Sequence, residues 1–574
     1  GGVGAQVNNL PGLAGGSFTV LAGAALVYGG PAVTTNTASI TLDGPGSEIR
    51  LVGGGNALAG LSANAAGAAL ILRSGRELPT TGDFTNAGVV ELGQGARLTT
   101  TGRFTNVSAG QVTLDGGAWS GTAFDNAGRI AGFGELAGPV AGAGALHVSG
   151  GTLTLHNGGQ VGQLQLTDGR LALGGDLRIT GDFDNSGVAQ PGGFDPRAGI
   201  DGPGRVLAAT PVALQLVGAH VVGGDRLALP SFRVGQGGVS TQFVVSRDAA
   251  EGPVVRAAVQ AVGAVDPALS GTAYDGAATG PIGPGQSAGP HTVRFNPVVG
   301  QALDGQALQV VSNFGNVGSV QLAVTGQAYS PAVAAVDANR IDLGIVRVGD
   351  AMPVRALTLA NTAPGTLTDV LHGKLSGAEG AFNAAGETAA IAAGSADSTS
   401  LTVTLDTRQS GAFSGAAVLG LTSRNPDLPD LALAEQLIEL RARVHAPAFA
   451  TLSLAGGTGQ LSGGNASYWL DFGTLMLGQP AATAELTLRN GAVGVADDLA
   501  GMFDLSALAQ PDWLLAGFTG FTGLAAGSAS PVLQVALQPM AVGRLSGTIR
   551  LATHSVNGFG PDLALPGIEL HLTA

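Results

Sequence analysis

Short segments in which apolar and polar residues alternate run through the first third of the chain. The segments 89–92 (VVEL) and 111–114 (QVTL) are examples, and glycine-rich stretches separate them. Alternation with a period of two is typical of β-strands with one buried face. Glycine supplies the positive φ that a sharp corner requires. The pattern predicts short strands joined by tight corners.

These segments recur with a period of about twenty residues. Phe84, Phe104 and Phe124 follow one another at intervals of 20, each is followed two positions later by asparagine, and another copy begins at Phe183. A fixed period of this length indicates stacked β coils, each of which buries its apolar face only against the next coil. We therefore predict a right-handed β-solenoid over residues 1–205.

Equivalent positions in successive coils of such a stack lie about 4.8 Å apart along its axis. The repeated phenylalanines are then expected to fill an internal aromatic column, and the repeated asparagines are expected to bond to one another along a corner. The predicted ladder residues are Phe84, Phe104, Phe124, Phe183, Asn86, Asn106, Asn126 and Asn185.

A different, two-part pattern occurs three times after residue 206. Its first part ends at a glycine, at 235, 349 or 478, and its second part contains a glycine 65, 62 or 65 residues later. Many short alternating strands in each copy are typical of β-sandwiches. We predict an all-β chain, with the solenoid followed in tandem by three Ig-like β-sandwich domains at 206–330, 331–446 and 447–574.

Composition narrows the class of function. The chain has 574 residues and a net charge of −14, and its arginines form no basic stripe, which excludes nucleic acid as a partner. Disulfides and thiolate metal sites are excluded because the chain has no cysteine. No uninterrupted apolar run is long enough to predict a membrane span.

Candidate catalytic and metal-binding residues are few. The eight histidines form no zinc motif, and no serine is matched to a histidine and an aspartate in the order or context of a serine hydrolase. Asp182, Asp184 and Asp201 are the candidates for calcium, but the nonapeptide of calcium-binding β-rolls does not recur. We predict no enzyme activity and no cofactor. Three tryptophans are expected to pack within the fold rather than to stack on sugars: Trp119, Trp469 and Trp513.

Two resemblances to known families support this organisation. The segments DGPGSE at 43–48, GDFTNAG at 82–88 and VAQPGG at 188–193 resemble the passenger β-helices of autotransporter-like and filamentous-haemagglutinin-like bacterial surface proteins, over about residues 20–205. The DFG opening at 471–473, the asparagines at 361 and 490, and the Pro-x-x-x-Gly turns resemble ASH (hydin-like), choice-of-anchor D type Ig-like domains, over about 208–574. The first of these domains departs most, with LPSF at 229–232 in place of the DFG opening.

These resemblances imply a secreted protein of the bacterial cell surface. We expect a non-catalytic structural protein, a filament, surface-layer or stalk subunit with an adhesion or matrix role. The segment 17–30 contains no polar helical cap, so the first coil is expected to be an assembly edge that other copies complete. The edge residues are Ser17, Phe18, Val20, Leu26 and Tyr28.

Glycans and a neighbouring cell surface are the other expected partners. Two alternatives stay open: a glycan-binding or glycan-cleaving module carried by the aspartates and tryptophans, and a passive spacer that presents a distal adhesin. The chain begins with Gly-Gly-Val, which suggests a processed or excised piece.

Overall fold

The computed structural model describes residues 13–191, 193–247, 250–377, 379–508 and 511–574. These residues form 52 strands and one short 3₁₀-helix, Thr272–Tyr274. The chain divides into two compact units, a first unit that ends at Ala328 and a second unit from Tyr329 to Ala574. Within the described residues, no helix has the length and apolar character that a membrane crossing requires.

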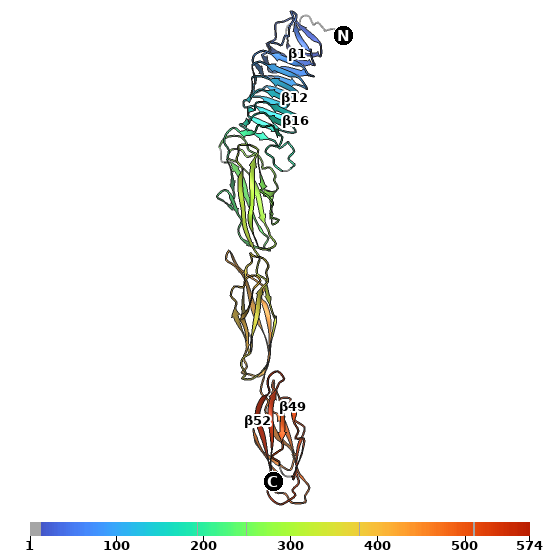
Figure 1. The fold of residues 1–574 in the computed structure, drawn as a ribbon, viewed down its shortest axis with the longest axis vertical. Coiled ribbons are helices and arrows are strands. Elements are labelled where there is room, and N and C mark those ends of the chain that lie inside the picture. Colours follow the sequence, from blue (N-terminus) through green and yellow to red (C-terminus); the bar gives the residue numbers. More distant parts are fainter. Residues whose placement is uncertain (1–12, 192, 248–249, 378, 509–510) are drawn as a thin grey trace. The chain divides into compact units, whose positions relative to one another are not determined.

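The first part of the first unit is a stack of parallel strands, which we call the parallel stack (residues 13–208). Strands drawn in blue and cyan lie one above another in Figure 1. Each strand pairs in parallel with a strand one repeat later, as Phe104 does with Phe84 on one side and Phe124 on the other. Burial alternates along these strands, so that Phe84 and Asn86 are buried and Thr85 is exposed.

The strands of the parallel stack are β1 (Ala14–Leu21), β2 (Ala25–Tyr28), β3 (Thr35–Asp43), β4 (Glu48–Leu51), β5 (Ala63–Asn64), β6 (Ala69–Arg73), β7 (Glu77–Thr80), β8 (Phe84–Asn86), β9 (Val89–Leu92), β10 (Arg97–Thr100), β11 (Arg103–Asn106), β12 (Gln111–Ser120), β13 (Ala123–Asn126), β14 (Arg129–Ala137), β15 (Val140–Ala141), β16 (Ala145–Leu155), β17 (Gly159–Val161), β18 (Gln163–Leu166), β19 (Arg170–Leu173), β20 (Leu177–Ile179), β21 (Phe183–Asp184), β22 (Ile200–Asp201) and β23 (Val206–Ala208).

The repeat length of the parallel stack is not constant. Paired residues are 20 apart between Leu70 and Val90, but only 16 apart between Ile130 and Leu146 and 29 apart between Leu171 and Ile200. The parallel register is kept because glycines at the corners accept different lengths of chain. Within β14, where the register with β16 shifts, Gly132 has φ of +100°, and a Cβ there would lie 1.9 Å from the carbonyl oxygen of Leu114 in the preceding repeat.

The first unit continues into two packed sheets, which we call the first sandwich (residues 214–328). One sheet has the order β24-β28-β31-β30, and the other has the order β25-β26-β33-β32-β29 with β27 beside β33. The parallel stack and the first sandwich share one continuous hydrophobic core. The strands are β24 (Leu214–Val217), β25 (Val221–Val222), β26 (Arg226–Ala228), β27 (Phe232–Arg233), β28 (Val239–Arg247), β29 (Ala257–Ala261), β30 (Leu269–Ser270), β31 (Ser287–Phe295), β32 (Gln301–Ser312) and β33 (Val320–Tyr329).

The second unit contains a second sandwich (residues 334–445) and a third sandwich (residues 450–573), each with its own core. The second is one sheet that folds over its core, in the order β34-β36-β39-β38-β37-β40-β42-β35 with β41 beside β40. Its strands are β34 (Ala334–Val336), β35 (Arg340–Arg347), β36 (Val354–Asn361), β37 (Val370–Ser376), β38 (Phe382–Glu387), β39 (Ala396–Leu405), β40 (Gly411–Asn425), β41 (Leu428–Ala432) and β42 (Gln436–His445).

The third sandwich has two sheets, ordered β43-β46-β50-β48 and β44-β45-β52-β51-β47-β49. Its strands are β43 (Ala450–Gly457), β44 (Gln460–Gly464), β45 (Ser467–Asp471), β46 (Ala482–Asn490), β47 (Asp498–Asp504), β48 (Trp513–Ala516), β49 (Phe521–Leu524), β50 (Leu533–Leu537), β51 (Ser546–Val556) and β52 (Leu563–Thr573).

An asparagine at equivalent positions makes the same kind of backbone hydrogen bonds in both of these sandwiches. Asn361 donates to the carbonyl oxygens of Asp369 and Ile391, at 3.0 and 3.2 Å. Asn490 donates to the carbonyl of Asp497 and to a second carbonyl, both at 3.0 Å. Both amides are buried, so each one satisfies backbone groups where a strand leaves its sheet.

Candidate functional site

Buried asparagines form a continuous ladder along the parallel stack. The Nδ2 of Asn86 donates to Oδ1 of Asn106 at 2.9 Å, and Asn106 donates to Asn126 at 2.8 Å. The ladder also includes Asn36 and Asn64, each of which donates to the next member at 2.8 Å. Each amide links one repeat to the next, and its second hydrogen binds a backbone carbonyl.

An aromatic column lies beside this ladder. The ring centroids of Phe84 and Phe104 are 6.1 Å apart, and those of Phe104 and Phe124 are 5.8 Å apart. Trp119 packs against all three rings, most closely against Phe104 at 3.9 Å, and is 1% exposed. Edge-to-face and tilted contacts of this kind add to the free energy gained by burying the rings.

Phe183 and Asn185 do not continue the column and the ladder, which corrects the sequence prediction. In the next three repeats, the residues in register with Phe124 are Val140, Gly159 and Leu177. Phe183 instead pairs with Leu164. The three intervening repeats are shorter than twenty residues, so Phe183 lies six residues beyond the column position at Leu177. Asn185 donates to the carbonyls of Asp195 and Ala198 in a local turn.

The predicted assembly edge lies in the first strands of the parallel stack. Within the described part of the chain, β1 pairs with β3 and β2 pairs with β4. Val20 and Tyr28 are each 5% exposed, Phe18 and Leu26 pack against the core, and Ser17 is exposed. Most of these side chains therefore face inward, so the groups that a further strand could pair with are the backbone amides and carbonyls of β1.

The aspartates considered for calcium are bound by arginines. Arg256, from the first sandwich, forms ion pairs with Asp182 and Asp184 and donates to the carbonyl of Phe183 at 2.7 Å. Arg170 binds Asp201, and this hydrogen bond holds the pKa of Asp201 below its usual value. No cluster of three or more metal-ligating side chains occurs among the described residues.

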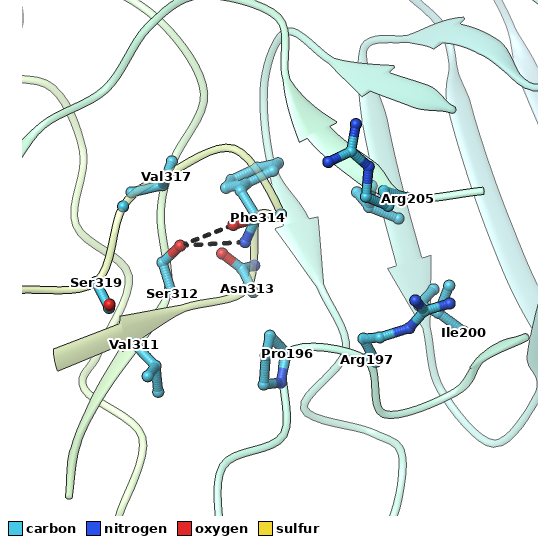
Figure 2. A pocket seen from close by; sticks show the side chains of 13 residues that line it. Pro196, Arg197, Ile200, Arg205, Val311, Ser312, Asn313, Phe314, Val317 and Ser319 are labelled. Atoms are coloured by element: carbon cyan, nitrogen blue, oxygen red, sulfur yellow. Dashed lines mark hydrogen bonds between the residues drawn. The ribbon is translucent and has the colours of Figure 1, made fainter. Parts of the chain in front are cut away.

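A cavity of about 400 Å³ lies between the parallel stack and the first sandwich. Figure 2 shows Arg197 and Arg205 on one side of it and Asn313 and Phe314 on the other. Arg197 donates to the carbonyl of Gly202 at 2.9 Å, and Asn313 donates to the carbonyl of Phe183 at 2.7 Å. The bond from Asn313 joins the first sandwich to the parallel stack, so the cavity lies at a structural junction.

A second junction joins the second and third sandwiches through buried charges. Arg347, at the end of β35, donates its Nε to Oδ2 of Asp497 at 2.5 Å, and its other nitrogens donate to the carbonyls of Pro561 and Ser555. The hydroxyl of Ser555 donates to the same carboxylate at 2.8 Å, and Nδ1 of His445 lies 3.1 Å from its other oxygen.

This carboxylate is fully buried, and Arg347 is 8% exposed. Burial by itself raises the pKa of Asp497, but the hydrogen bonds from Arg347 and Ser555 outweigh it and hold the pKa below the usual value. Two backbone bonds, between Ala446 and residues 495 and 497, run beside the pair. The junction thus consists of an ionised pair enclosed by both sandwiches.

The sequence pattern did not identify Arg256, Arg347 or Asp497 as important. Arg347 and Asp497 are 150 residues apart, and neither belongs to a short motif. Trp469 is 46% exposed and stacks on His571 at 5.4 Å, while Trp513 is buried. Arg256, Arg347 and Asp497 all lie where two elements of the fold meet.

No protein-family model and no curated protein sequence matches the chain. Among solved structures, the ASH / PapD-like domain 7 of human CEP192 is 12% identical, with 20% of this chain and 85% of that chain covered and a TM-score of 0.16. A Porphyromonas gingivalis protein of unknown function is 15% identical over 40% and 99%, with a TM-score of 0.15. Mouse protocadherin-24 EC1-3 is 8% identical over 55% and 89%, with a TM-score of 0.26. With scores this low, the all-β assignment rests on the sheets described above.

Proposed function

We propose that this chain is a non-catalytic extracellular structural protein of a bacterial cell surface. In this proposal the parallel stack is a right-handed β-solenoid, and the sandwiches that follow it in the chain are Ig-like domains. One observation carries the proposal: the buried polar side chains hold successive elements together. The asparagine ladder links repeats, Arg256 links the stack to the first sandwich, and Arg347 links the second sandwich to the third.

The physical argument concerns where buried polar groups are used. A buried charge or amide is costly unless it is hydrogen-bonded, so each one in a fold has a purpose. In an enzyme, some of these groups line a cleft, where they hydrogen-bond to a substrate rather than to the protein. Here the buried carboxylate of Asp497 is bound by Arg347, and the buried amides of the ladder bind one another. Because these buried polar groups bond to other parts of the protein, they favour a structural role over a catalytic one.

We further propose that the chain assembles with other copies through the outer edge of β1, as a filament, surface-layer or stalk subunit with an adhesion or matrix role. Thr19 and Leu21 are exposed on this strand, and Leu21 is 62% exposed. A parallel strand of another copy can add to an unpaired edge through backbone hydrogen bonds. Head-to-tail addition of this kind produces an open fibre where the rotation between copies does not close into a ring.

Negative-stain electron microscopy at high and low protein concentration tests this proposal. Regular fibres that shorten on dilution, and that are lost in Leu21→Lys, support it, because a lysine on an edge strand blocks strand addition. Leu437→Lys is the matched control, since Leu437 is 66% exposed on β42, which has a neighbour on both sides. Single particles at every concentration contradict assembly. The passive spacer is then the remaining hypothesis.

A further inference from the structure

A groove of about 690 Å³ crosses three adjacent strands of the second sandwich, β35, β42 and β40. We call it the arginine groove. It has three arginines, one carboxylate, one hydroxyl and two phenylalanines, set among small residues. The lining residues are Arg340, Asp342, Gly344, Ile345, Ala412, Phe413, Ser414, Arg441, Ala442, Arg443 and Phe559.

The strand register places the arginines side by side on the outer face. Burial alternates along β42, so Arg441 and Arg443 are exposed while the residues between and beside them are buried. Two residues along a strand correspond to about 6.6 Å. Ser414 and Ala412 lie opposite these arginines on β40, so short side chains leave the guanidinium groups open to solvent.

The arginines of the groove are poorly neutralised. Within the described residues, neither Arg340 nor Arg443 forms an ion pair, and Arg441 has its nearest carboxylate oxygen, from Glu439, at 3.9 Å. Asp342 uses one oxygen to accept the backbone N–H of Gly344 at 2.9 Å. Three positive charges thus face two carboxylates, Asp342 in the lining and Glu439, which lies opposite Arg340 in the strand register, in a chain whose net charge is −14.

The third sandwich shows that the fold does not need these arginines. Asp471 there accepts the N–H of Gly473, as Asp342 accepts that of Gly344. In this frame Trp469 occupies the position of Arg340, and Thr573, paired with Asp471, occupies the position of Arg441. Thr573 donates to Asp471 at 3.2 Å, so the carboxylate is satisfied without an arginine. At these two positions the third sandwich therefore has no arginine.

We propose that the arginine groove binds a carboxylate-bearing polysaccharide, a chain of uronic acid rings. A guanidinium group binds a carboxylate through two parallel hydrogen bonds, and several guanidinium groups along a strand suit a chain with one carboxylate on each ring. The volume lies within the range of small-ligand sites. Phe559, which is 74% exposed at the groove, provides a ring face for a sugar.

The lining favours a glycan over a protein partner. The energetic centre of a protein interface is an apolar pocket filled by an aromatic or arginine anchor. The groove instead has glycine, alanine and serine between its arginines, and Phe413 is half-buried in the core of its own sandwich. A narrow, polar, negatively charged chain fits this surface. The proposal goes beyond the structural role and does not depend on assembly through β1.

Isothermal titration calorimetry of the full chain with oligogalacturonate tests the proposal, with neutral dextran as the comparison ligand. The variant Arg441→Gln/Arg443→Gln is expected to bind about tenfold or more weakly, because each charge-assisted hydrogen bond is lost. The matched control is Arg355→Gln/Arg544→Gln. It removes the same charge from exposed arginines outside the groove, neither of which forms an ion pair with a described residue.

Binding of oligogalacturonate but not dextran, weakened in the groove variant and kept in the control variant, supports the proposal. Equal weakening in both variants means that only net charge matters and overturns the site. Absence of binding to oligogalacturonate also overturns it. Polyglutamate that binds as tightly as oligogalacturonate overturns the assignment to a glycan, because an acidic peptide is then an equal occupant.

Discussion

Arg347 and Asp497 form a buried ion pair between two sandwiches, with Nε 2.5 Å from Oδ2. The carboxylate is wholly inaccessible to solvent, and the guanidinium group binds two further backbone carbonyls of the third sandwich. Removing one partner of such a pair leaves an uncompensated buried charge, which is far more costly than the pair itself is stabilising. The pair therefore makes the junction depend on both sandwiches being folded and docked.

Replacing Arg347 with methionine is expected to destabilise the second unit by about 3–5 kcal/mol. Methionine is the residue of the third sandwich at the corresponding place, Met476, where it is 76% exposed. Urea denaturation measures the change. Arg408→Met is the control, because Arg408 pairs with Asp406 on the surface and such a pair contributes about 0–1 kcal/mol. Equal losses in the two variants would show that the junction pair has no special role.

The junction is expected to weaken in acid. The pKa of Asp497 in the folded protein lies below its usual value, whereas the pKa of an unfolded aspartate is about 3.9. The stabilisation is therefore fully present above the unfolded pKa and is lost as pH falls from there through the folded pKa. Unfolding of the second unit followed at several pH values below about 5 measures it. Asp497→Asn should be less stable at neutral pH and should lose part of this acid dependence; an unchanged acid profile contradicts the prediction.

A central member of the asparagine ladder is expected to be harder to replace than its exposed neighbour. Asn106 accepts from Asn86, donates to Asn126, and binds the carbonyl of Gly110 at 3.0 Å. Asn106→Ala leaves buried donors and acceptors unpaired, at about 1–3 kcal/mol for each such group. Thr85→Ala, an exposed change on a neighbouring strand, should stay within about 0.5 kcal/mol.

Hydrogen exchange of the parallel stack measures this difference. Faster exchange of amides in the repeats on both sides of residue 106, with little change in the second unit, is the expected pattern. Equal protection in Asn106→Ala and Thr85→Ala would mean that the ladder contributes nothing beyond the strand pairing.

The sequence predicted the ladder where the repeat length is constant and failed where it changes. Asn86, Asn106 and Asn126 are spaced by 20, and the structure places them in contact. Asn36 and Asn64 were missed because their spacings are 28 and 22, and Phe183 was misassigned because shorter repeats precede it. A period identifies a stack, but corner length is set by glycine-rich loops that no side-chain pattern constrains.

The joints between elements were beyond sequence analysis for a different reason. Each depends on residues far apart in the chain, such as Arg256 with Asp182 at a separation of 74. Alternation and periodicity describe contacts within an element or between equal repeats, and they carry no information on a single pair. The arginine groove is of the same kind, since strand register brings Arg340 and Arg441 to one face.

The aromatic column provides the most direct test that the parallel stack has one continuous core. Phe104 is fully buried and contacts Phe84, Trp119 and Phe124. Phe104→Ala removes these contacts and leaves a cavity, with an expected cost of about 3–5 kcal/mol. Phe104→Leu should cost less, because aliphatic residues already occupy the column at Val140 and Leu177.

We expect the free energy of unfolding to fall in the first unit and not in the second. The core that contains Phe104 includes the parallel stack and the first sandwich but no residue of the second unit. Urea denaturation followed by tryptophan fluorescence detects it at Trp119 in the column, and hydrogen exchange follows the first sandwich, which has no tryptophan. Phe559→Ala is the control, because that ring is 74% exposed and its removal should change stability by less than about 0.5 kcal/mol. A loss confined to a few repeats, with the first sandwich unchanged, would mean that the repeats unfold independently, as in a one-dimensional array in which each contacts only its neighbours.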